Sequence, residues 1–153
     1  MIYFIFIIFS YLFHSYLHEM SHLCATKFLV GVDKYKIKPY PHKNQELGFV
    51  WASIKIKRIN IATNFQNGLI FFSPRFANIL FCLIIAFVYL QGFELSIYFK
   101  IFLGGGMVDL LTGSLGVSES SDLKRYCKSW NLNPWQPRLV GCMLSIFFLI
   151  ILF

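Results

Sequence analysis

Four apolar runs, separated by segments that carry most of the charged residues, dominate this sequence. The runs cover approximately residues 2–30, 68–90, 96–117 and 139–153. About 20 apolar residues are enough to cross the hydrocarbon core of a bilayer, where only helices and closed barrels satisfy their own backbone groups. The pattern predicts an all-α membrane protein with a single integral membrane domain over residues 1–153. Three long helices would form its core, and the last and shortest run would add a fourth membrane helix.

The composition also indicates that these runs face lipid. Of the 153 residues, 57% are hydrophobic and 14% are charged, whereas soluble domains average about 45–50% and about 25%. The first run is not preceded by basic residues and lacks a small-residue cleavage site, so we expect a retained helix and not a signal peptide.

The basic residues, which give the chain a net charge of +7, gather in two segments at residues 32–67 and 118–137. Basic loops of membrane proteins remain on the cytoplasmic side, so both segments are predicted to be cytoplasmic in a multi-pass protein. Because no nucleic-acid motif accompanies them, we expect a lipid bilayer and not a nucleic acid as partner. The alternation of Ile54, Lys55, Ile56 and Lys57 predicts a short β-strand or hairpin between the first two helices.

The first run ends in a motif with specific chemistry, because residues 18–22 read His-Glu-Met-Ser-His. On a helix, this HExxH spacing sets His18 and His22 on one face, where two imidazoles can bind zinc, with Glu19 beside them as a general base. Ionisable residues within a membrane helix are costly and usually functional. The alternative is a polar cluster that joins helices through hydrogen bonds.

A third ligand is expected from a later part of the chain, and Asp109 is the carboxylate within an apolar run. His22 lies eight residues before Val30 and Asp109 lies eight residues before Val117, which places both about 12 Å inside their helices. Asp122 remains the alternative if residues 118–125 fold back towards the histidines. His14, one turn before the motif, is expected to pack or to support a ligand.

These features together resemble the site-2 protease family of intramembrane zinc metalloproteases. The resemblance covers roughly residues 10–125 and rests on the HExxH motif, on Asp109, on a strand-like segment at 47–50 and on Ser73-Pro-Arg-Phe-Ala-Asn78, which is similar to the family's small-Pro-x-x-Asn signature. Ser21 and Leu110 stand where the family commonly has glycine. The resemblance implies a zinc-dependent endopeptidase that cleaves membrane-spanning proteins or peptides, with Asn78 binding substrate or packing between helices.

Two other functions fit the same residues. One is a non-enzymatic membrane metal-binding protein or a subunit of a larger complex, and the other is a membrane zinc hydrolase with a non-peptide substrate. Glu19 distinguishes the first from an enzyme, because a metal carrier needs no general base. The glycines at 104–106 predict either close helix packing or a local break that admits water.

Overall fold

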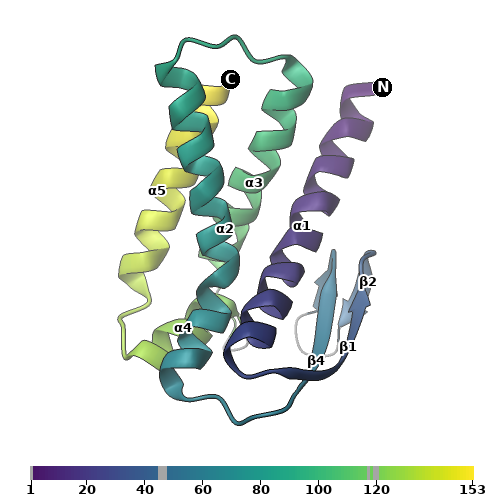
Figure 1. The fold of residues 1–153 in the computed structure, drawn as a ribbon. Helices are drawn as coiled ribbons and strands as arrows, with labels where there is room; N and C mark the ends of the chain where they lie inside the picture. The colour runs from purple at the N-terminus through teal and green to yellow at the C-terminus, as the bar shows by residue number, and fades with distance from the viewer. Residues whose placement is uncertain (1, 45–47, 117, 119–120) are drawn as a thin grey trace.

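The computed structural model describes residues 2–44, 48–116, 118 and 121–153, and over these it is mostly helical (Figure 1). Its elements in chain order are α1 (Ile2–Leu29), β1 (Val32–Lys38), β2 (His42–Asn44), β3 (Gly48–Val50), β4 (Ser53–Arg58), α2 (Asn64–Leu90), α3 (Ile97–Leu115), α4 (Asp122–Trp130) and α5 (Trp135–Leu152). Strands β1 and β4 form one antiparallel pair and β2 and β3 another. The expected strands between the first two helices are therefore confirmed.

The four long helices lie side by side, with α3 between α1 and α5, and α2 against α1 and α3 (Figure 1). Helix α4 packs across one end of α2, and the β1–β4 sheet lies beside the C-terminal half of α1 at the same end of the molecule. Both chain termini lie at the opposite end. The two basic segments thus share one end of the helices.

The surface of the helices is strongly apolar. Among the described residues, α2 and α5 are the two helices that are long and apolar enough to cross a membrane. Large apolar side chains are exposed along three of the helices, among them Ile2, Phe4 and Phe9 on α1, Leu83 and Phe87 on α2, and Met143, Ile146, Phe147 and Ile150 on α5. So many exposed apolar side chains are costly in water and suit contact with acyl chains.

Helix α4 was not predicted from the sequence, where its residues were placed in a basic loop. Leu123, Tyr126 and Cys127 are buried at the i, i+3 and i+4 positions of one face and pack with Phe71 and Phe72 of α2. Nine residues are too few for the length rule that identified the membrane helices. This apolar spacing is the sequence signal that would have indicated the helix.

Two helix starts also lie earlier than expected. Helix α2 begins at Asn64 because Thr63 and Gln66 form a capping box, in which each side chain accepts a hydrogen bond from the other residue's backbone N–H. Helix α5 begins at Trp135 and includes Pro137, which the first turn of a helix tolerates because its missing N–H has no partner there.

Close packing explains the three glycines of α3, which is helical throughout residues 104–106. A Cβ atom built on Gly105 would lie 2.1 Å from Ser10 Oγ and 3.3 Å from the Ser10 backbone carbon of α1. The local break considered above is therefore not observed. Gly105 and Gly106 allow α1 to approach α3, and Gly104 faces Leu149 of α5 and Phe153.

Gly105→Ala should lower the stability of the folded protein by about 1–3 kcal/mol, because the added methyl group overpacks the contact between α1 and α3. The measurement is thermal unfolding in a mild detergent. Gly113→Ala is the matched control, since its Cβ would meet its nearest neighbour, Arg75 Nη2, at 3.9 Å. Equal unfolding temperatures for the two variants would contradict this account of the packing.

Candidate metal centre

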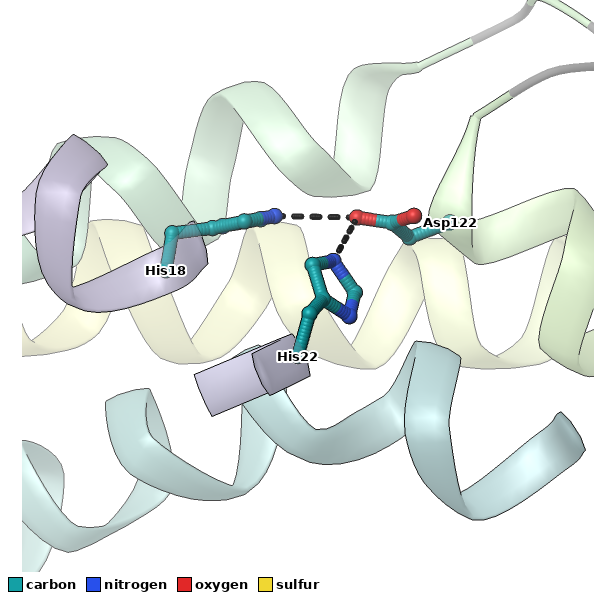
Figure 2. A group of neighbouring side chains, drawn as sticks. All are labelled: His18, His22 and Asp122. Atoms are coloured by element: carbon teal, nitrogen blue, oxygen red, sulfur yellow. Dashed lines mark hydrogen bonds and ion pairs between the residues drawn. The ribbon is translucent and has the colours of Figure 1, made fainter. Parts of the chain in front are cut away.

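The HExxH motif lies on α1, where its helical spacing brings the two histidine side chains together, with ring centroids 5.2 Å apart. Nε2 of His18 and Nε2 of His22 each lie 2.9 Å from the same oxygen, Oδ2 of Asp122 (Figure 2). These three residues form a group that could hold a metal ion, with ligand atoms within 4.8 Å of one another. An ion about 2 Å from each ligand atom needs a cluster of this size.

Asp122 reaches the histidines because the chain turns back after α3. Two arginines hold the C-terminal end of that helix: Arg75 donates to Gly113 O at 2.7 Å and to Ser114 Oγ at 2.9 Å, and Arg138 donates to Gly116 O at 3.0 Å. Cations at this end also offset the negative end of the helix dipole. Asp122 is then the first residue of α4, whose buried face fixes it against α2.

Asp109 lies beside His18, but on the side of the ring away from Asp122. Its Oδ2 is 3.1 Å from His18 Nδ1, the ring nitrogen that faces away from Asp122. The group that the structure brings together therefore contains Asp122 in the place where the sequence analysis put Asp109. The prediction from depth assumed that the chain leaves the site after Val117, whereas α4 returns it.

The hydrogen bonds behind the histidines determine which nitrogens are free to bind a metal. Nδ1 of His22 lies 2.8 Å from Ile70 O, and because a carbonyl only accepts, Nδ1 must carry the proton. Nδ1 of His18 donates to the Asp109 carboxylate in the same way. In the neutral rings both Nε2 atoms then present lone pairs towards Asp122.

The Asp122 carboxyl completes a cluster of electron-rich atoms. Burial alone would raise the pKa of this group, but the adjacent His22 and His18, in their protonated form, hold it well below its usual range. Two imidazole lone pairs and a carboxylate oxygen within hydrogen-bond distance repel one another unless protons or a cation lie between them. The donor set, two neutral imidazoles and one carboxylate, fits zinc.

Asn78 and His14 are buried polar residues that do not belong to this group of three. Asn78, only 5% exposed, donates from Nδ2 to Asp109 Oδ2 at 2.9 Å and so holds the carboxylate that holds His18. Its expected role in substrate binding stays a prediction. The buried His14 donates from Nε2 to Phe102 O at 2.9 Å and does not reach Asp122, so it has the packing role considered above.

Glu19 opens on a cleft of about 890 Å³ that is also lined by His18, His22, Asp109 and Asp122. Ile54 of β4 lines the same cleft, and its backbone interacts electrostatically with the Glu19 carboxylate. Among the described strands β4 pairs with β1 alone, and its residues Ser53, Ile54 and Ile56 line the cleft that the metal group also lines. Glu19 is not part of the ligand group, which leaves its carboxylate available for other chemistry.

Several partners of the site were not identified from the sequence. Backbone groups such as Ile70 O carry no sequence signal, because every residue has them. Arg75 did carry one, since a charged residue inside an apolar run usually has a specific role. Comparison with protein families, with curated proteins and with solved structures gave no match to this chain.

Proposed function

We propose that this protein is an intramembrane zinc endopeptidase, similar to the site-2 proteases, that hydrolyses peptide bonds of membrane-spanning substrates. One observation carries the proposal. The Nε2 atoms of His18 and His22 converge on Asp122, each Nδ1 atom is held by an acceptor, and Glu19 from the same turn opens on the adjoining cleft.

Zinc would be held by His18, His22 and Asp122, three protein ligands that leave a fourth position open, as in catalytic zinc sites. When bound, it supplies a Lewis acid that polarises water and the substrate carbonyl. Asp109 and Ile70 O are positioning groups, because they fix the tautomer and the orientation of the two imidazoles. Asn78 in turn orients Asp109.

Glu19 is the general base in this proposal. Its carboxylate takes a proton from water as the water oxygen forms a bond to the carbonyl carbon of the substrate. When the C–N bond breaks, the same carboxyl group returns the proton to the leaving nitrogen. Glu19 lines the cleft beside Ile54 and lies outside the ligand group.

The edge of β4 beside Glu19 favours a peptide substrate over a lipid or a small amide. A helical peptide hides its backbone, so cleavage requires an extended segment. A strand edge with no partner among the described strands binds such a segment through main-chain hydrogen bonds. In this proposal α1 and α3, which pack against α2 and α5, cross the membrane together with those two apolar helices, and the basic segments lie on the cytoplasmic side.

A non-enzymatic metal-binding protein would use the same histidines, and Glu19 argues against it. Among the contacts of the described residues, the Glu19 carboxylate forms no hydrogen bond with His18 or His22, yet Glu19 lines the cleft beside them. A metal carrier gains nothing from a charged group in that place, whereas a hydrolase needs one.

Purified protein in liposomes should contain about one zinc per chain, as three protein ligands predict, and should cleave a membrane-spanning peptide. Removal of the metal with a chelator should stop cleavage, and added zinc should restore it, because in this proposal the metal polarises the water and the substrate carbonyl. Zinc content is measured by atomic absorption and cleavage by mass spectrometry. Metal-free protein with full activity would contradict the proposal.

A further inference from the structure

The cleft beside the metal centre is strongly basic. Lysines from three strands line it, namely Lys36 and Lys38 of β1, Lys43 of β2 and Lys55 of β4. Among the described residues, its carboxylates are Glu19, Asp109 and Asp122. Asp109 and Asp122 belong to the metal centre, and Glu19 is its general base. Every described carboxylate that lines the cleft therefore already has a role at the metal centre, and none is reserved for the lysines.

The sheet places like charges directly opposite each other at this point. Lys36 of β1 pairs across the strands with Lys55 of β4, and both line the cleft. Like charges in opposed positions destabilise a sheet, so this pair is stabilised when an anion lies between its ammonium groups. The neighbouring pair of Lys34 and Lys57 lies outside the cleft lining, and there Lys57 forms a 2.8 Å ion pair with Asp33.

Two arginines continue the basic surface on the side of α2 and α4. Arg58 at the end of β4 donates to Asn67 Oδ1 at 2.7 Å, and the guanidinium of Arg125 lies 5.3 Å from the ring centre of Phe71. Burial and the positive charge of Arg125 both lower the pKa of Arg58. Two cations are thus held near each other in the wall of the same cleft.

The orientation rule for membrane proteins explains why basic residues lie at this end of the helices, but not why they line one cleft. An exposed lysine satisfies that rule equally well on any outer surface, as Lys34 and Lys128 do. Lys36, Lys55 and Arg58 instead line the space that adjoins Glu19 and the edge of β4 that has no partner among the described strands. A ligand in that space would be extended and anionic.

We propose that this basic cleft binds an acidic, extended polypeptide segment, so that substrates carry Asp or Glu residues beside the scissile bond. That the segment belongs to a substrate rests on the proposed peptidase function. The binding itself does not, because Lys36, Lys55 and Arg58 act without the metal. A lipid headgroup is less suited, since the cleft extends from the strands to the metal group and adjoins a strand edge.

The test is binding of fluorescein-labelled peptides to the Glu19→Gln protein in a neutral detergent, followed by fluorescence anisotropy. One peptide alternates Glu with Val, and the other has Gln in place of every Glu. The acidic peptide should bind at least about tenfold more tightly, and added salt should reduce the difference by screening. The measurement is repeated after chelation, so that coordination of peptide carboxylates to zinc does not contribute.

The double variant Lys36→Gln with Lys55→Gln should weaken binding of the acidic peptide about three- to tenfold and leave the Gln peptide unchanged. Lys34→Gln with Lys57→Gln is the matched control, because it removes the same charge from the same sheet outside the cleft. Equal binding of the two peptides, or equal losses in the two double variants, would overturn the proposal. A third result would also overturn it: nanodiscs of anionic lipid compete for the cleft, and the cleft variant loses this competition but still binds the acidic peptide. Peptide binding without any cleavage by the wild-type protein would reject the peptidase function and leave the basic cleft supported.

Discussion

Glu19→Gln should reduce peptide hydrolysis by a factor of about 10² to 10⁴ while leaving the zinc content near one per chain, since the amide cannot accept a proton from water. The substitution keeps the size of the side chain and removes no member of the ligand group, which consists of His18, His22 and Asp122. Activity and metal content are therefore expected to separate in this one variant.

The measurement compares turnover of a membrane-spanning peptide in liposomes with zinc content of the same preparation. Glu94→Gln is the matched control, because Glu94 is an exposed residue in the connection between α2 and α3, at the end of the molecule away from α4 (Figure 1). That control should keep full activity. Unchanged turnover in Glu19→Gln would mean that another group is the base, and loss of zinc would mean that Glu19 is a ligand.

Much of this site follows from local sequence patterns. The HExxH spacing alone places His18, Glu19 and His22 on adjoining positions of one helix, and the apolar runs predict the long helices. The alternation of Ile and Lys at residues 54–57 predicts β4, which the structure contains as Ser53–Arg58. Each of these signals has a period or spacing that one element imposes by itself.

The remaining features depend on contacts between distant parts of the chain. The position of Asp122 results from the packing of α4 on Phe71 and Phe72, and from the arginines that hold the end of α3. No periodicity reports how a chain turns between two helices. The position of a residue along its helix does not say which neighbouring atoms its side chain contacts. The sequence therefore indicated that Asp109 lies near His18, but not that its carboxylate contacts Nδ1.

Asp122→Asn should lower the zinc affinity by more than about 100-fold, whereas Asp109→Asn should lower it by about 10-fold. Loss of the Asp122 charge removes a direct ligand, while changes behind a ligand typically cost 10- to 100-fold. In Asp109→Asn the amide oxygen still accepts from His18 Nδ1, so the imidazole keeps its tautomer and the expected loss lies at the lower end of that range.

Affinity is measured by competition with a chromophoric chelator, and thermal unfolding of the zinc-free proteins checks that both variants fold. The two substitutions are matched in size and in charge, so the comparison depends on position alone. Asp122 Oδ2 lies 2.9 Å from both Nε2 atoms, whereas the one imidazole nitrogen that hydrogen-bonds to Asp109 among the described residues is Nδ1 of His18. The larger loss is therefore expected for the residue on the Nε2 side. A larger loss in Asp109→Asn would instead assign the third ligand to α3 and require α4 to move away when zinc binds.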